Sequence, residues 1–278
     1  MIGKSGLVVG LLFVCHTANA AILYEFRQIA RSDSGAQASS EFSGRAVIDG
    51  DRSRVDVVGG NAYTPGAYII TSNGSRTMTF VDPTKKIYAE VNAGGVAASL
   101  GASKITVDNL TQALSKLDDH PVIAGVPTDH YRLNLGYDIT LTMGTIVLKQ
   151  VVRTTIDKWT TVIFGDVAES FLANTGIRTG NPKLDEIITL ETTKIKGFPL
   201  RETMETTTTD ARYGNSESEL SKAGAYNRTR RQSREMTITS IRQADAPANT
   251  FTVPATFRKA ESGDEKLSST QVQNLSME

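Results

Sequence analysis

The chain contains few of the residues that cross-link a fold, bind metals or span a membrane. Cys15 is the only cysteine among 278 residues, and there are only three histidines. A single cysteine cannot form a disulfide within the chain, so the fold depends on a hydrophobic core large enough to stand alone. Beyond residue 20, no apolar run approaches the ~20 residues that a membrane-spanning helix needs. We therefore expect no transmembrane segment.

An excess of either charge is also missing. Thirty Lys and Arg residues balance thirty Asp and Glu residues, which gives a formal net charge of zero at pH 7. A balanced chain has no overall attraction to nucleic acid or to an anionic membrane. We expect no nucleic-acid partner, and contacts with a charged surface would have to be local.

The first twenty residues have the pattern of a secretory signal peptide. Lys4 precedes the uncharged apolar run Gly6–Val14, and Ala18-Asn19-Ala20 follows. A positive start, an apolar run of about 7–15 residues and an A-x-A cleavage site together form this signature. We therefore expect an exported protein that begins at Ala21 and contains no cysteine.

The clearest periodicity covers His130 to Met143, where apolar and polar residues alternate. A period of two predicts a long strand with one apolar and one polar face, as in an antiparallel sheet that is solvated on one side. The apolar face either packs into an ordinary core or lines a ligand cavity, and the sequence leaves both interpretations open. The candidate lining residues are Tyr131, Leu133, Leu135, Tyr137 and Ile139.

Shorter β-rich segments precede and follow this strand, separated by Asp-Gly, Asn-Gly and Gly-Gly turn signals. Their spacing predicts a meander in which sequential strands are neighbours. The expected strands are residues 22–29, 42–48, 54–58, 68–71, 77–81, 86–91, 145–164, 198–209, 234–241 and 251–253.

Three segments show helical signals. Asp108–Leu117 has apolar residues at the i, i+3, i+4 and i+7 spacing of one helix face. Asp166–Asn174 opens with the spacing of a capping box, and Asn181-Pro182 has a cap followed by proline in the first turn. Together with the strands, they predict an α+β fold, a strongly curved antiparallel sheet covered by a few short helices.

The predicted organisation is a signal peptide at residues 1–20, one domain at residues 21–258, and a disordered polar tail at residues 259–278. The segments Ala93–Ser103 and Gly214–Gly224 are rich in small or polar residues and are expected to be a linker and a hairpin tip.

No motif indicates a reaction. His120 and His130 each follow an aspartate, but their spacing matches no zinc motif, and His130 lies on the polar parity of its strand, where a solvated histidine is expected. There is no Gly-x-Ser-x-Gly elbow and no phosphate-binding loop. Glu202 and Glu205 are interpreted as a solvated sheet face. We expect a protein that is not an enzyme and needs neither metal nor cofactor.

The strongest local charge is the basic run from Arg228 to Arg234. In a strand, Arg228, Arg230 and Arg234 share one face and Arg231 lies on the other. These three arginines are candidates for binding a partner. The alternative is a solvated hairpin arm opposite the acidic residues Glu217 and Glu219.

Several phrases resemble a family of exported bacterial proteins that carry a domain of unknown function. The overall layout is also similar to periplasmic lipoprotein carriers of the LolA/LolB type, although the segment Gly165–Glu191 and the polar tail depart from that pattern. The phrases are Ala46–Val57, Tyr68–Gly74, Phe80–Tyr88, Gly125–Tyr131, Lys196–Arg201 and Phe251–Pro254.

The resemblance implies an incomplete antiparallel β-barrel whose hollow holds acyl chains, and a periplasmic location, with an extracellular location as the alternative for an exported protein. It makes a lipid or lipoprotein the expected ligand. A second hypothesis is an envelope protein that senses stress or binds another protein without a small ligand. A third is an uncharacterised hydrolase that uses Asp129 and His130.

Overall fold

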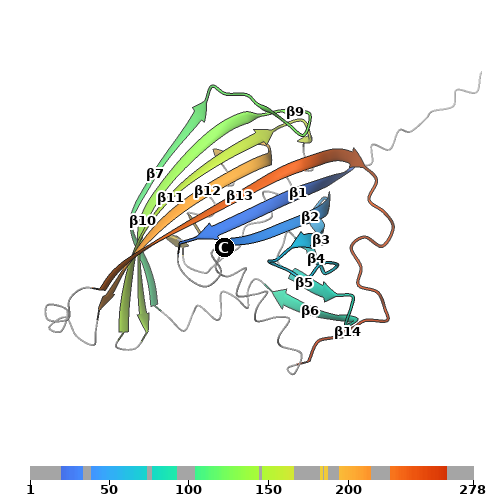
Figure 1. The fold of residues 1–278 in the computed structure, drawn as a ribbon, viewed down its shortest axis with the longest axis horizontal. Coiled ribbons are helices and arrows are strands. Elements are labelled where there is room, and N and C mark those ends of the chain that lie inside the picture. Colours follow the sequence, from blue (N-terminus) through green and yellow to red (C-terminus); the bar gives the residue numbers. More distant parts are fainter. Residues whose placement is uncertain are drawn as a thin grey trace, which may run out of the picture.

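The computed structural model describes residues 20–33, 39–73, 77–92, 104–143, 146–165, 182–183, 185–186, 194–213 and 226–261. Most of these residues belong to one twelve-stranded sheet, and a separate two-stranded pair accompanies it (Figure 1). The strands are β1 Ala21–Ser32, β2 Ser39–Asp49, β3 Arg52–Gly60, β4 Tyr68–Ser72, β5 Thr77–Asp82, β6 Ile87–Asn92, β7 Lys104–Leu117, β8 Val122–Ile123, β9 Val126–Pro127, β10 Asp129–Met143, β11 Ile146–Thr161, β12 Phe198–Tyr213, β13 Tyr226–Ala244 and β14 Arg258–Lys259.

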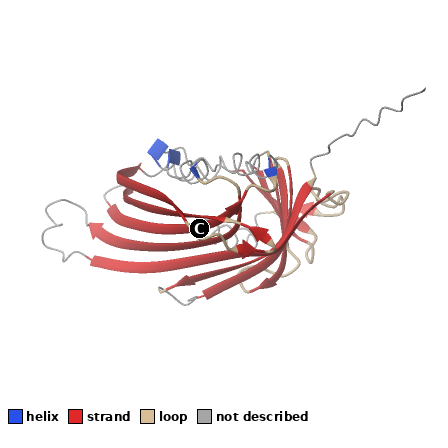
Figure 2. Cartoon of the chain, turned by 90° about the horizontal axis from the view of Figure 1, so that it is seen from above, coloured by secondary structure: helices blue, strands red, loops and turns tan. Residues whose placement is uncertain are grey.

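The sheet joins two meanders. Its order is β14-β6-β5-β4-β3-β2-β1-β13-β12-β11-β10-β7, so the first strand pairs with the thirteenth. Every pairing is antiparallel except that of β14 with β6. β7 and β14 lie at opposite ends of this order, so the sheet is open and does not close into a barrel, although its strands curve strongly (Figure 2). The meander expected from the turn signals is confirmed.

The predicted α+β class is wrong. In the described part of the chain, helical residues are limited to Gly165, residues 182–183, residues 185–186 and Lys194, while strands dominate (Figure 2). The described residues therefore form an almost all-β open sheet, without the expected cover of short helices. The expected helix Asp166–Asn174 lies outside the described residues.

The expected helix Asp108–Leu117 is part of the strand β7. Its residues pair with β10, from Leu117 opposite His130 to Lys104 opposite Thr142. Leu114 lies directly opposite Leu133, so the spacing that suggested a helix face instead places an apolar residue beside an apolar strand neighbour. Pairing of the backbone with β10 overrides the local pattern, because short apolar runs fit both periods.

The largest core lies where the two meanders meet. Phe26, Phe42, Leu200 and Ile238 pack together with other buried apolar side chains, and the β8–β9 hairpin contributes Ile123, Ala124 and Val126 around them. Phe26 contacts Phe42 edge to face at 5.1 Å between ring centroids. Burial raises the pKa of Tyr24 at this core to about 12. The hydrophobic effect thus holds the two halves of the sheet together.

The C-terminal segment 245–257 runs from β13 to β14 (Figure 1). It forms a strap whose apolar residues pack on β4–β6. Phe251, Val253 and Phe257 pack against Tyr68, Ile70, Val81 and Tyr88. The expected strand Phe251–Val253 is wrong, since these residues form turn and irregular structure. The strap ends in β14, where Arg258 pairs with Ile87.

Gly60 offers a test of the close approach between β2 and β3. Its φ is +113°, and an added Cβ would lie 2.1 Å from the Glu41 carbonyl oxygen. We expect Gly60→Ala to reduce the free energy of unfolding, measured by urea denaturation, by more than the ~1–2 kcal/mol of left-handed strain alone.

Gly66 is the matched control. It also has a positive φ, +88°, but no atom lies within 4 Å of the added Cβ. Gly66→Ala should therefore reduce the free energy of unfolding only by the ~1–2 kcal/mol of left-handed strain. Equal losses in the two variants would show that the contact with Glu41 is relieved at little cost.

Candidate functional site

The predicted apolar stripe lies on one face of β10, as the alternation required. Leu133, Ile156, Met204 and Arg234 are consecutive register partners across β10, β11, β12 and β13, so their side chains share a face. We call this the inner face. By parity, it also carries Tyr131, Leu135, Tyr137 and Ile139.

One end of the stripe is packed core. Leu133 and Leu135 are 1% and 7% exposed, and they form a cluster with Ile156 and Ile195. Tyr131 and Met204 pack against this cluster and remain partly exposed. For the two leucines, the structure therefore favours the core interpretation over a cavity lining.

The other end of the stripe is more open. Tyr137 and Ile139 are only partly buried, and their register partners on β11 are Val152 and Gln150. Burial raises the pKa of Tyr137 above its usual value. From Tyr131 to Ile139 the stripe runs for about 27 Å, at ~3.4 Å per residue.

A buried ionic cluster adjoins the packed end. Glu202 accepts contacts from Lys158 Nζ at 2.9 Å and from Arg234 Nη2 at 2.7 Å. The Lys158 and Glu202 side chains are 14% and 11% exposed, so this is an interior arrangement. Burial alone would raise the pKa of the Glu202 carboxyl, but the charges of and hydrogen bonds from Lys158 and Arg234 outweigh it and lower the pKa. The expectation of a solvated face holds for Glu205 and is wrong for Glu202.

A second ionic pair lies further along the same face. Arg230 Nη2 is 2.9 Å from Asp210, and Gln150 donates to the same carboxylate at 2.9 Å. The predicted shared face of Arg228, Arg230 and Arg234 is confirmed by their register with Asp210, Thr208 and Met204. Arg228 is exposed. Glu217 and Glu219, the expected partners of a solvated arm, lie outside the described residues.

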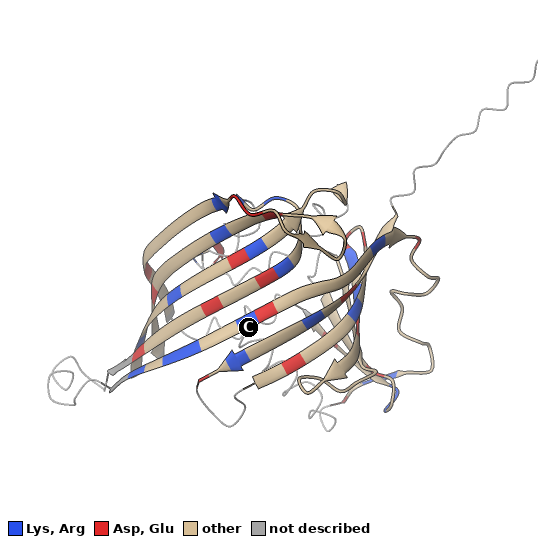
Figure 3. Ribbon diagram, turned by 45° about the horizontal axis from the view of Figure 1, so that its top comes forward, with Lys and Arg blue, Asp and Glu red and all other residues tan. Residues whose placement is uncertain are grey.

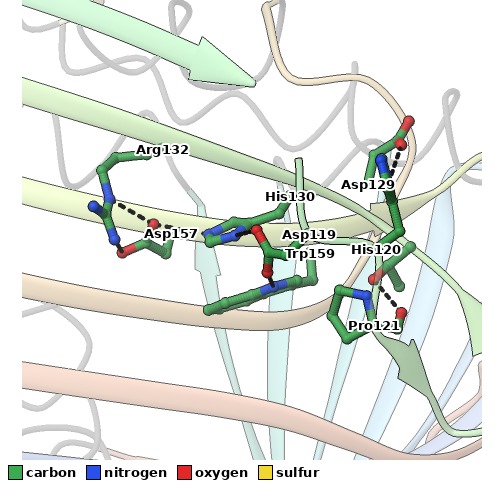
Figure 4. Close-up of polar contacts among 9 residues, drawn as sticks. Asp119, His120, Pro121, Asp129, His130, Arg132, Asp157 and Trp159 are labelled. Carbon is green, nitrogen blue, oxygen red and sulfur yellow. Dashed lines mark hydrogen bonds and ion pairs between the residues drawn. The ribbon is translucent and has the colours of Figure 1, made fainter. Parts of the chain in front are cut away.

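His130 occupies the opposite, outer face and is buried (Figure 4). Its Nδ1 is 2.6 Å from Asp119 and its Nε2 is 2.9 Å from Asp157, while the ring stacks on Trp159 at 4.2 Å. The expectation of a solvated histidine is wrong. Each ring nitrogen of His130 therefore contacts one carboxylate.

The outer cluster is built as a structural clamp. Arg132 makes a bidentate contact with Asp157, through Nε at 2.8 Å and Nη2 at 3.1 Å. Arg201 lies over the Trp159 ring at 4.9 Å. Lys and Arg are interspersed with Asp and Glu along these strands (Figure 3). The contacts join β10, β11 and β12 to the loop that carries Asp119.

The proposed Asp129–His130 hydrolase finds no support in this arrangement. Asp129 contacts Lys116 at 2.9 Å and His120 at 3.2 Å, while His130 uses the other two aspartates. Within the described residues, no Ser, Thr or Cys side chain hydrogen-bonds to His130, and no cluster of three metal-ligating side chains occurs. A nucleophile positioned by its base, which covalent catalysis requires, is missing from this part of the structure.

A small void of about 10 Å³ has room for about one water molecule. It is lined by Val57, Tyr63, Tyr68, Phe80 and neighbouring residues. In the described ranges, no helix is both long and apolar enough to cross a bilayer.

No protein-family model and no curated protein matches this chain. Among solved structures, an uncharacterized conserved protein from Thermus thermophilus is similar over 85% of this chain and 90% of its own, with 6% identity and a TM-score of 0.32. A LolA superfamily protein from Nitrosomonas europaea aligns over 83% of this chain and 90% of its own, with 10% identity and a TM-score of 0.28.

A structure of PNGF-II is similar over 89% of this chain but only 32% of its own, with 9% identity and a TM-score of 0.31. One neighbour thus belongs to the superfamily named by the resemblance. All three TM-scores are low, so none of these likenesses indicates a function for this chain.

The ionic cluster on the inner face generates a stability prediction. Glu202→Gln leaves Lys158 and Arg234 without their shared counter-charge, so we expect a loss of about 3–5 kcal/mol in the free energy of unfolding at pH 7. Glu205→Gln, on the exposed outer face of the same strand, is the control and should change stability by less than ~0.5 kcal/mol.

The pH dependence follows from the lowered pKa of Glu202. Its stabilisation is fully present above the unfolded value of ~4.3 and is lost as the pH falls through the lower folded value. The difference between the wild type and Glu202→Gln should therefore shrink in acid denaturation. A gap that persists unchanged below that window would exclude the ionised carboxylate as its source.

The outer cluster generates a second stability prediction. His130→Ala removes the group between Asp119 and Asp157, so we expect a loss of about 1–3 kcal/mol in thermal or urea unfolding. His120→Ala is the control, because the His120 side chain is 55% exposed and should contribute little. Equal effects from the two changes would argue against a structural role for His130.

Proposed function

We propose that the protein is an exported, non-enzymatic binding or carrier protein for an apolar ligand, such as an acyl chain, a lipid or the lipid part of a lipoprotein. The observation that carries the proposal is the apolar stripe on the inner face of an open, curved sheet. The stripe continues from the packed Leu133–Leu135 end to the partly buried Tyr137 and Ile139. Export is supported by the signal-peptide pattern of residues 1–20.

Binding would follow from burial of hydrocarbon. Each methylene group transferred from water to the stripe would contribute roughly 0.8 kcal/mol before the costs of ordering the chain are subtracted. Tyr137 and Ile139 are the residues we expect to contact the ligand, because they are the stripe positions left partly open at this end. Leu133 and Leu135 would support that surface from the core.

The test is binding of N-phenyl-1-naphthylamine, a neutral apolar fluorophore, to the wild type and to Tyr137→Asp. A charge placed at this position should weaken binding by at least about tenfold, since a carboxylate is costly to bury beside hydrocarbon. Asn134→Asp adds the same charge on the exposed outer face of the same strand and should bind as the wild type does.

Native mass spectrometry of protein purified without detergent gives an independent readout. A co-purifying lipid or acylated peptide of defined mass, reduced in Tyr137→Asp, is the expected result. If a folded Tyr137→Asp protein binds the fluorophore and its co-purifying ligand as well as the wild type, the stripe is not the binding surface.

A further inference from the structure

Cations outnumber carboxylates on the inner face beside the apolar stripe. Over the described positions 150–158, 202–210 and 228–236, this face carries four cations and two carboxylates. The surplus lies mainly on β13, which contributes three arginines of the same strand parity. The charged inner-face residues are Lys158, Arg228, Arg230, Arg234, Glu202 and Asp210.

Two of these arginines retain unused donors. Arg230 and Arg234 each contact a carboxylate through Nη2 alone, although a guanidinium carries five N–H groups. Among the described residues, the Nε atoms of both are buried without a hydrogen-bond partner. The side chains are 34% and 25% exposed, so part of each guanidinium-bearing side chain is accessible on the inner face.

The cations and the apolar stripe form one continuous surface. Arg234 continues in register through Met204 and Ile156 to Leu133. Arg230 continues through Thr208 and Val152 to Tyr137 in the same way. With neighbouring strands ~4.8 Å apart, each arginine lies about 14 Å across the sheet from the stripe.

Resting on the proposed function, we infer that the inner face selects amphiphiles in which a hydrocarbon chain carries one anionic group, a carboxylate or a phosphate. The hydrocarbon chain crosses the inner face from the stripe on β10 toward β13, and the anion lies over β13, where it accepts hydrogen bonds from the terminal nitrogens of Arg230 and Arg234. Charge-assisted hydrogen bonds from guanidinium groups suit both anions. Arg228, which is exposed, adds to the attraction.

The test compares dodecanoate, dodecyl phosphate, dodecan-1-ol and inorganic phosphate as competitors of N-phenyl-1-naphthylamine, below their micellar concentrations. The direct affinity of inorganic phosphate is measured by calorimetry. The two anionic amphiphiles should bind the wild type about 10- to 100-fold more tightly than the alcohol. Inorganic phosphate should bind far more weakly, because it lacks the chain.

The preference should fall to within a few-fold in Arg230→Gln and Arg234→Gln, while binding of dodecan-1-ol stays unchanged. Among the described residues, the Arg228 side chain is exposed and has no partner, so Arg228→Gln tests the charge even if the other two variants are unstable. Arg228→Gln should reduce the preference for the anionic amphiphiles over dodecan-1-ol by about half an order of magnitude. Arg231→Gln, on the outer face of the same strand, is the control and should keep the full preference.

The outcomes separate the two proposals. If no amphiphile competes, the proposed function fails. If the alcohol binds as tightly as the two anions, hydrocarbon binding stands and anion selection is overturned. If inorganic phosphate binds as tightly as dodecyl phosphate, selection of amphiphiles is overturned and the inner face is a site for a free anion. Loss of the preference in Arg231→Gln as well would show that overall charge, and not the inner face, is responsible.

Discussion

The register of the long antiparallel strands is the constraint on which the rest of the structure depends. From β7 through β10 to β13, directly opposed residues share a face, so one alignment decides which side chains lie inside and which lie outside. A slip of one residue would exchange Leu133 for Arg132 on the inner face. The register of β11 with β12 shifts between Trp159 and Thr160, so Leu200, which is buried in the core, has no directly opposed residue on β11.

The two faces of the same strands show different chemistry as a result. On the outer face, ion pairs and the His130–Trp159–Arg201 stack tie neighbouring strands together where water is close. On the inner face, the ionic cluster around Glu202 separates two apolar clusters, one containing Leu200 and the other Met204. The strand alternation that gives a barrel an inside and an outside thus gives this open sheet two faces of different chemistry.

Much of this arrangement could be predicted from sequence, and the exceptions have physical causes. The alternation over residues 130–143 identified β10 and both of its faces, because strand parity is local. The helix expected at residues 108–117 was wrong, because only pairing with β10 distinguishes the two periods there. The alternation placed His130 on the correct face of β10. It did not indicate that the side chain is buried, because the burial depends on Asp119 and Trp159, which come from other segments. No local signal marked Lys158 as the partner of Glu202, although charges within a threonine-rich strand were a usable hint.

The C-terminal strap has a consequence for how the protein is made. Its aromatic residues cover Tyr68 and Val81, and β14 completes the edge beside β6, although about 170 residues of chain separate these segments. The edge therefore forms only after residues 245–259 have been synthesised, and its apolar outer surface stays uncovered until then. Such non-local pairing is slow and leaves intermediates prone to aggregation. A folding intermediate without the strap therefore exposes the apolar side chains of Tyr68, Ile70 and Val81.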